Sequence, residues 1–198
     1  MPRPLTEVFA SMTPLWLLIA GFPRGGTQYA ANLLTKCGFR AGHESIFKNG
    51  QIVSEGAAEI EVSGFATPYL AAIARSGTPI VHLLREPVAN ITSKVNYWRN
   101  RGHRITWDQA CLEWFAAHET IDEFSQFTVR VEDLGKHIPE IVRLFADPEE
   151  RIPTCDQIAD AEKLAARGES MAGGIWVWND LPAGLKDYAQ RHGYEGEA

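Results

Sequence analysis

Short apolar runs along the chain alternate with longer stretches in which apolar residues recur at helical spacing. Continuous apolar or β-branched runs, bounded by Gly, Pro or charged residues, predict strands buried in a sheet. The predicted strands lie at 15–20, 39–43, 79–84 and 127–131. The helices predicted from spacing, capping residues and terminating glycines lie at 29–37, 67–75, 87–98, 106–124 and 156–167.

The order of these elements predicts an α/β fold of three layers around a mainly parallel central sheet. Residues 45–63 have no clean period, so they are interpreted as a loop that can act as a lid. Residues 176–194 are expected to pack on the body, and Glu132 and Asp133 to cap the helix after the last strand. Ligands collect at the carboxyl ends of such strands, so we expect the site there.

The composition fits one globular domain spanning residues 1–198, because 45% of the residues are hydrophobic and 22% are charged. The net charge of −6 argues against a generic polyanion surface, so no nucleic-acid partner is expected. The longest early apolar run, 15–22, is too short for a membrane span. Three scattered cysteines, without the spacing of a metal site, indicate reduced thiols in a cytoplasmic protein.

A glycine-rich loop at 21–27 joins the first predicted strand to the first helix. Glycines there allow backbone N–H groups to close around a phosphate at the positive end of the helix. The glycine spacing is that of a nucleoside-triphosphate loop, but Thr27 and Gln28 replace its Lys and Ser/Thr. With Arg24 as its only cation, the loop is expected to hold phosphate without a metal. The alternative is a strand-to-helix turn that binds nothing.

A second candidate anion site is Arg85-Glu86-Pro87, where a predicted strand ends and a helix begins. Ser93 lies eight residues after Arg85, in that helix. A planar guanidinium and a hydroxyl can share one phosphate monoester. Taken alone the pair is weak evidence, because an arginine at a strand end is more often a surface ion-pair partner and Ser93 is also explained as a helix-surface residue.

Together these sites resemble the P-loop-containing sulfotransferase family that uses 3′-phosphoadenosine 5′-phosphosulfate (PAPS), in its bacterial-type members. Pro23-Arg24-Gly25-Gly26-Thr27 resembles the 5′-phosphosulfate loop, and Arg85-Glu86-Pro87 with Ser93 resembles the 3′-phosphate motif. Residues 129–134 resemble an Arg-x-Glu-Asp-Leu stretch of the family, and 180–182 and 192–194 resemble its tail. The resemblance covers about Leu15 to Tyr194 and implies a P-loop NTPase-like fold.

The resemblance also implies roles for individual residues. Arg24, Gly26 and Thr27 would hold the 5′-phosphate and the sulfuryl group, with Gly25 shaping the loop, and Arg85 and Ser93 would hold the 3′-phosphate. Tyr29 stands where relatives carry an aromatic residue that contacts adenine, although a helix core residue explains it equally well. Gln28 departs from the usual Ser or Thr, and its amide N–H would replace a hydroxyl contact.

Sulfuryl transfer needs positive donors at the leaving oxygen and a base for the acceptor's proton. Arg24 is the natural donor, and Glu44 is the favoured base because its strand is expected to neighbour the first strand. The family resemblance supports an acidic base at this place. His43 is the next choice because its unperturbed pKa is convenient, and Glu44 would then only orient Arg24 through an ion pair.

The sequence therefore predicts a metal-independent sulfotransferase with PAPS as co-substrate and adenosine 3′,5′-bisphosphate as product. The acceptor is expected to be a hydroxyl on a glycan, lipid or small metabolite. Its pocket would be open, or completed by a homodimer partner or by the loop at 45–63. Basic residues at 94–104 indicate a solvated face, or a surface for an anionic glycan. The alternative hypotheses are a small-molecule P-loop kinase and a non-catalytic nucleotide-binding module.

Overall fold

The computed structural model describes residues 15–48, 51–52, 58–144, 152–165 and 176–196. Its central sheet has five strands in the order β2-β5-β1-β6-β7, and all four pairings are parallel. The strands are β1 (Leu17–Gly21), β2 (Ala41–His43), β5 (Ile60–Ser63), β6 (Ile80–Leu84) and β7 (Phe127–Arg130). The predicted α/β fold with a mainly parallel sheet is confirmed.

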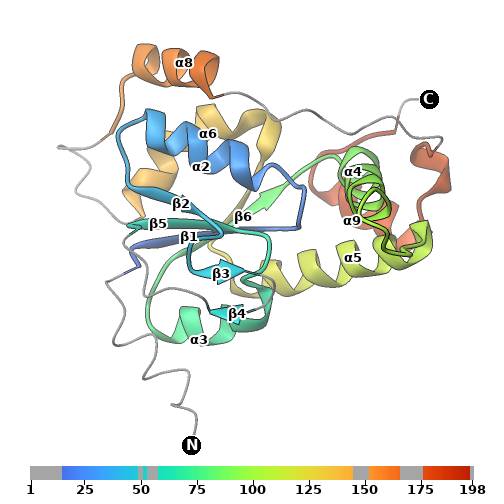
Figure 1. Cartoon of the computed structure of the whole chain (residues 1–198). Helices are drawn as coiled ribbons and strands as arrows, with labels where there is room; N and C mark the ends of the chain where they lie inside the picture. The colour runs from blue at the N-terminus through green and yellow to red at the C-terminus, as the bar shows by residue number, and fades with distance from the viewer. Residues whose placement is uncertain (1–14, 49–50, 53–57, 145–151, 166–175, 197–198) are drawn as a thin grey trace, which may run out of the picture.

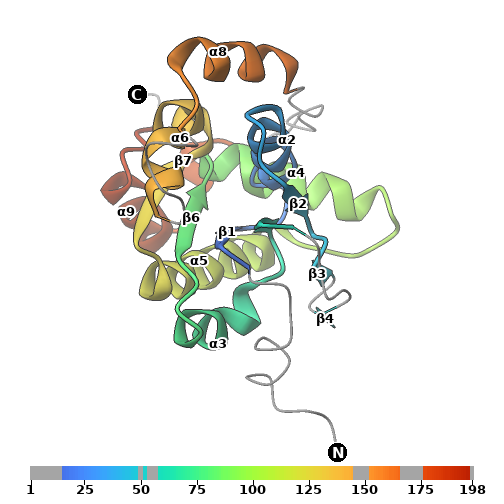
Figure 2. The ribbon, with the colours of Figure 1, turned by 90° about the vertical axis from the view of Figure 1, so that its left-hand side faces the viewer.

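Helices cover both faces of this sheet and make three layers (Figure 1). On one face lie α2 (Thr27–Lys36), α6 (Leu134–Arg143) and α8 (Cys155–Leu164). On the other face lie α3 (Leu70–Arg75) and α5 (Trp107–Phe124). Next to α5, at one side of the sheet, stand α4 (Pro87–Arg99) and α9 (Ala183–Arg191). Figure 2 shows α8 stacked outside α2 and α6.

Short elements complete the described part. The 3₁₀ turns are η1 (Thr67–Tyr69), η2 (Val131–Asp133) and η3 (Trp178–Asp180). A two-stranded antiparallel ribbon is formed by β3 (Phe47–Lys48) and β4 (Gln51–Ile52). None of the helices in the described ranges has the length and apolar character that a bilayer crossing requires.

The two faces of β1 explain its continuous apolar run. Leu17 and Ile19 pack into the cluster formed with α2, α6 and α8, whereas Leu18 and Ala20 pack into the cluster formed with α3 and α5. All four residues are at most 1% exposed. A strand covered by helices on both faces has no polar side, so its sequence does not alternate.

The prediction of a loop over 45–63 is wrong for the described residues, and residues 49–50 and 53–57 lie outside them. This stretch contains β3, β4 and the buried strand β5, which pairs with β1 on one side and β2 on the other. The expected adjacency of the first two strands is therefore also wrong, because β5 lies between β1 and β2. The sequence signal failed because Glu61 is charged and yet fully buried in the middle of β5, which interrupts the apolar pattern.

The expected cap on α6 also differs in detail. Asp133 occupies the N-cap position, but its side chain makes no capping hydrogen bond. It accepts hydrogen bonds from Arg130 and Lys136 instead. By contrast, Thr106 caps α5 as predicted by accepting from the Gln109 N–H at 3.1 Å. The part of the helix predicted beyond residue 165 lies outside the described residues.

Candidate functional site

The loop between β1 and α2 has a backbone that depends on glycine. Gly26 is the N-cap residue of α2 with φ of +89°, and a Cβ there would collide with the Val131 side chain. A Cβ on Gly25 would lie 2.7 Å from the Phe22 carbonyl oxygen, to which the Gly25 N–H donates at 2.8 Å. The start of α2 has no side-chain cap and no acidic residue in its first turn. Its N–H groups can therefore receive an anion.

The loop is joined directly to the second candidate motif. Arg85 Nη1 donates to the Arg24 carbonyl oxygen at 2.9 Å, and Arg24 Nε donates to Ser93 Oγ at 3.4 Å. Ser93 is buried on the side of α4 that faces the loop. The structure thus brings together residues that stand 61 and 69 positions apart in the sequence. Both cations and the hydroxyl lie at the carboxyl ends of β1 and β6.

Asn90 contributes to this junction, although the sequence argument did not single it out. Its Nδ2 donates to the Pro23 carbonyl oxygen at 3.2 Å, while its Oδ1 accepts from Trp114 Nε1 at 3.1 Å. Asn90 is fully buried, so both bonds hold the loop in one position. Asn90 precedes Ser93 by three residues, so the two share one face of a helix. That spacing is the signal that would have found it.

The tip of β2 reaches the start of α2 despite the intervening strand. His43 Nε2 lies 3.0 Å from Thr27 Oγ1 and 3.7 Å from Glu44 Oε1. Glu44 has φ of +51°, in the left-handed region, where a residue other than glycine is uncommon. His43 and Glu44 therefore stand beside the loop. Among the described ion pairs, the acidic group of Glu44 meets His43 and not Arg24.

The surroundings shift the pKa values of both candidate bases. Burial, with a smaller effect from the Arg24 charge, lowers the pKa of His43 below its usual 6.5. Burial, followed by the neighbouring charge of Glu61, raises the pKa of Glu44 above its usual 4.5. His43 is consequently neutral at pH 7, and Glu44 is a stronger base than an ordinary surface carboxylate. The geometry leaves either residue able to accept a proton.

Glu61, on the neighbouring strand β5, holds the backbone next to His43 and Glu44 in place. Its carboxylate accepts from Ser45 Oγ at 2.5 Å and from the Ile46 N–H at 3.1 Å. Both donors directly follow Glu44 in the chain. Burial raises the pKa of Glu61, against which these hydrogen bonds act. Glu61 was missed because the strand that carries it was predicted as a loop.

The C-terminal segment closes the site near Arg85. Tyr194 OH donates to the Glu132 carboxylate at 2.9 Å and lies 3.2 Å from the Leu84 carbonyl oxygen. Arg130 Nη1 donates to the Gly193 carbonyl oxygen at 3.0 Å. The stretches 129–134 and 192–194, which resembled later motifs of the family, therefore meet at the ends of β6 and β7. Burial lowers the pKa of Arg85, and the charge of Glu132 opposes that shift.

Two residues that were predicted to contact the nucleotide have side chains that are engaged elsewhere in the structure. Tyr29 is 6% exposed and packs in the hydrophobic cluster under α2. Its position supports the interpretation that Tyr29 is a helix core residue. Gln28 is exposed, and its Nε2 donates to Asn32 Oδ1 at 3.1 Å along the helix. In the described ranges no three His, Cys, Asp or Glu residues gather as a metal site would require. Metal independence stays a prediction.

Comparisons with known proteins place the fold. No protein-family model matches the chain, and no curated protein matches it. Among solved structures, the crystal structure of mouse sulfotransferase SULT7A1 complexed with PAP is similar, with a TM-score of 0.59. The match covers 94% of this chain and 86% of that chain at 12% sequence identity. At this identity the likeness shows a shared fold.

Proposed function

We propose that this protein is a sulfotransferase that moves a sulfuryl group from PAPS to an acceptor hydroxyl on a glycan, lipid or small metabolite. The observation that carries the proposal is the direct junction of the two anion-binding motifs, through Arg85 and the Arg24 carbonyl at 2.9 Å and through Arg24 and Ser93 at 3.4 Å. PAPS carries phosphate groups on both sides of its adenosine. The shared fold with a sulfotransferase complexed with PAP supports the same donor.

In the proposed reaction the acceptor oxygen attacks sulfur in line with the bond to the 5′-phosphate. The sulfur–oxygen bridge breaks, and its electron pair goes to the phosphate oxygen. The Arg24 guanidinium and the N–H groups of Gly26 and Thr27 stabilise the charge that develops there. Glu44 takes the acceptor's proton, and the alternative base is His43, whose Nε2 lies 3.0 Å from Thr27 Oγ1 at the start of α2. The products are a sulfate ester and adenosine 3′,5′-bisphosphate.

The nucleotide would be held at both ends by residues of the junction. Arg85 and Ser93 bind the 3′-phosphate, because a planar guanidinium and a hydroxyl offer several donors at once. Gly25 shapes the loop and Thr27 holds the 5′ end. The Gln28 N–H, in the first turn of α2, contributes at the same end. Tyr29, packed in the core, supports the helix rather than the adenine.

Calorimetry with adenosine 3′,5′-bisphosphate and with ATP, each with and without Mg²⁺, tests the donor. We expect tighter, metal-independent binding of the bisphosphate. A preference for Mg-ATP would contradict the proposal in favour of a kinase. Slow hydrolysis of PAPS by the unaltered protein, lost in Arg24→Ala, would separate an enzyme from a non-catalytic binding module.

A separate variant tests whether Arg85 binds the 3′-phosphate. Arg85→Ala should weaken binding of the bisphosphate at least tenfold more than binding of adenosine 5′-monophosphate, because a charged hydrogen bond contributes about 1.5–3 kcal/mol. Arg75→Ala, which removes an exposed arginine at the end of α3, is the matched control. Equal losses for both nucleotides would assign Arg85 only to support of the loop.

A further inference from the structure

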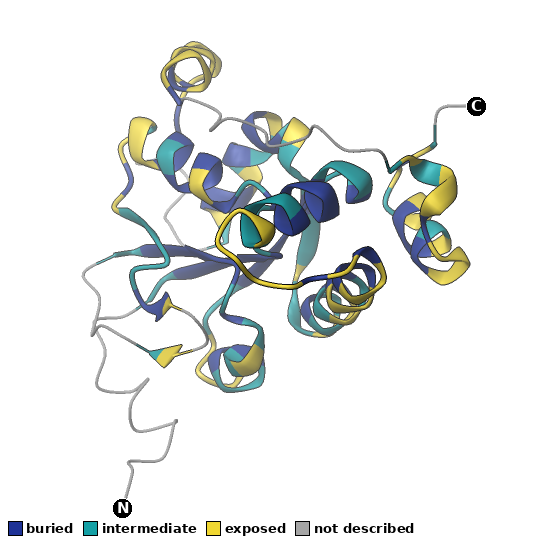
Figure 3. Ribbon diagram, turned by 45° about the vertical axis from the view of Figure 1, so that its right-hand side comes forward, coloured by how far each residue is buried: buried dark blue, intermediate teal, exposed yellow. Residues whose placement is uncertain are grey.

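One segment of this acidic protein is strongly basic. Residues 87–106 contain four Lys or Arg and no Asp or Glu, whereas the whole chain has a net charge of −6. Lys94 is buried and paired with Glu113 at 2.6 Å. Arg99, Arg101 and Arg104 are exposed. Figure 3 shows this exposed connection between α4 and α5 in yellow.

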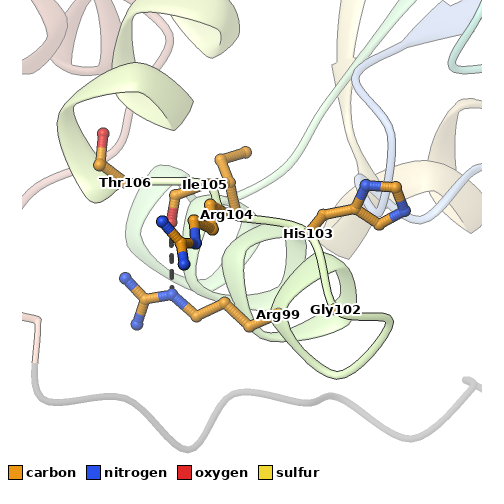
Figure 4. Close-up of a pocket in the computed structure, with 6 residues that line it drawn as sticks. All are labelled: Arg99, Gly102, His103, Arg104, Ile105 and Thr106. Carbon is orange, nitrogen blue, oxygen red and sulfur yellow. Dashed lines mark hydrogen bonds between the residues drawn. The ribbon is translucent and has the colours of Figure 1, made fainter.

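Two of these arginines line a hollow in the surface (Figure 4). It has a volume of about 360 Å³ and is bordered by residues 99 and 102–106. Arg99 is anchored through its Nε to the Ile105 carbonyl oxygen at 3.3 Å. Arg104 lines the same hollow, while the His103 ring points away and packs against Trp98.

The charge of these arginines is not balanced within the described part of the chain. No described Asp or Glu lies within ion-pair distance of Arg99, Arg101 or Arg104. The dipole of α4 accounts for Arg99 alone, because α4 ends at that residue and the effect falls off within the last turn. Two guanidinium groups that line one hollow without a carboxylate each offer a planar fork of donors to an added anion.

Arg101, which directly precedes the lining residue Gly102, is linked to the candidate site by an aromatic ring. The Arg24 guanidinium lies 4.8 Å from the centre of the Tyr97 ring, and the Arg101 guanidinium lies 3.6 Å from it. Ser93, which contacts Arg24, precedes Arg99 by six residues, which is about 9 Å along a helix. A molecule longer than one sugar ring could therefore reach from the loop to the hollow. Trp176 stacks on Trp107 with ring centres 4.7 Å apart and lies under the Arg99 guanidinium.

We propose that the hollow lined by Arg99 and Arg104 binds a carboxylate or sulfate group of an oligosaccharide acceptor. A hydroxyl of the same acceptor attacks the sulfuryl group that is held beside Arg24. This inference rests on the proposed sulfotransferase function and narrows its acceptor to an anionic sugar chain. Arg101 and Tyr97 line the path between the two ends. The group in the hollow does not react, so it contributes binding and sets which hydroxyl meets the sulfuryl group.

The test is calorimetry on the full chain with two probes of equal length. One is a tetrasaccharide of alternating glucuronate and N-acetylglucosamine, and the other is the neutral tetrasaccharide of N-acetylglucosamine. We expect the charged probe to bind at least tenfold more tightly, and added salt to weaken it. Arg104→Glu should reduce its affinity at least tenfold. The side chain of Arg104 is exposed and makes no hydrogen bond or ion pair with the described residues, so this variant should fold.

Two controls separate the possible failures. Lys163→Glu makes the same change of charge at an exposed site on α8 and should leave binding of the charged probe unchanged. Arg104→Glu should leave the affinity for adenosine 3′,5′-bisphosphate unchanged. Equal binding of the two tetrasaccharides, no effect of Arg104→Glu, or tighter binding of a short RNA would overturn the inference. If the bisphosphate itself fails to bind, the proposed function fails, while the charged probe still reports on the hollow.

Discussion

At the scale of single residues, the electrostatics of the site depend on two acids of unequal exposure. Glu61 is fully buried and held by Ser45 and Ile46, and its charge contributes to the raised pKa of Glu44. Glutamine at position 61 keeps an oxygen that can accept from the Ile46 N–H but removes the charge. This substitution therefore separates the electrostatic effect of Glu61 from its structural one.

We predict that Glu61→Gln shifts the acid limb of the pH profile for PAPS hydrolysis to lower pH. A base acts only when deprotonated, so the rate rises with pH through the pKa of Glu44. Removing a neighbouring negative charge lowers that pKa. The measurement is kcat/KM from about pH 4 to pH 8, a range that brackets ordinary carboxylate and histidine pKa values.

His43→Gln distinguishes the two candidate bases in the same assay. If Glu44 is the base, His43→Gln keeps the acid limb and Glu44→Gln abolishes it. If His43→Gln removes the limb and Glu61→Gln leaves it in place, the base is His43. An unchanged profile in all three variants would contradict both assignments.

Motif spacing could predict Arg24, Arg85 and Ser93 because each follows a predicted strand or lies in the helix after it. Their direct contacts could not be predicted, because which strands neighbour each other depends on the sheet order. Asn90 and Glu61 act through hydrogen bonds to backbone groups distant in the sequence. A single sequence does not show such partners.

At the scale of elements, β5 is a strand that the hydrophobic pattern of the sequence does not predict. The apolar runs of β1 and β6 identify buried strands, and β7 follows from its β-branched residues. β5 has only four residues, with Glu61 buried and Ser63 bonded to the Phe65 N–H at 2.9 Å. Buried polar groups that are satisfied by hydrogen bonds look like a loop in the sequence.

Helix α9 is attached to the sheet through Asp122. One carboxylate oxygen of Asp122 lies 2.5 Å from His82 Nδ1, and the other accepts from Tyr188 OH and lies 3.2 Å from His192 Nε2. These hydrogen bonds, opposed by burial, hold the pKa of Asp122 well below its usual range. The same C-terminal segment brings Tyr194 to the edge of the candidate site. Asp122 therefore links the docking of α9 to the surroundings of Arg85.

We predict that Asp122→Ala detaches α9 and destabilises the protein by about 1–3 kcal/mol, because it removes a hydrogen-bond partner from the buried side chains of His82 and Tyr188. Hydrogen exchange at 183–191 should accelerate more than exchange in β1. Glu119→Ala, on the exposed side of the same helix, should change neither. Equal acceleration in α9 and β1 would mean that Asp122 supports the whole fold and not the docking of one helix.

At the scale of the whole molecule, the parallel sheet explains why the site could be placed before its contacts were known. Parallel strands end at one edge, so residues that follow β1 and β6 must meet there. The aromatic and histidine side chains between α5, β6 and α9 gave no such signal. Their contacts depend on how the layers pack against one another, and the ring centres of His82 and His118 lie 4.8 Å apart.

These two histidines make the stability of the whole protein depend on pH. Both are fully buried, and His118 Nε2 has no hydrogen-bond partner among the described residues. Burial lowers the pKa of His82 below 6.5 and that of His118 well below it. The unfolded chain therefore binds more protons than the folded chain once the pH falls below about 6.5. Stability is then complete above that pH and falls as the pH decreases.

We predict a loss in the free energy of unfolding of up to about 1.4 kcal/mol per pH unit for each histidine below pH 6.5. The measurement is urea unfolding at several pH values between about 5 and 8, which bracket the ordinary histidine pKa. His118→Gln should reduce the slope of stability against pH even if it lowers the stability itself. His137→Gln removes a partly exposed histidine on α6 and should leave the slope unchanged. Parallel slopes for the unaltered protein and His118→Gln would show that the buried pair does not control acid unfolding.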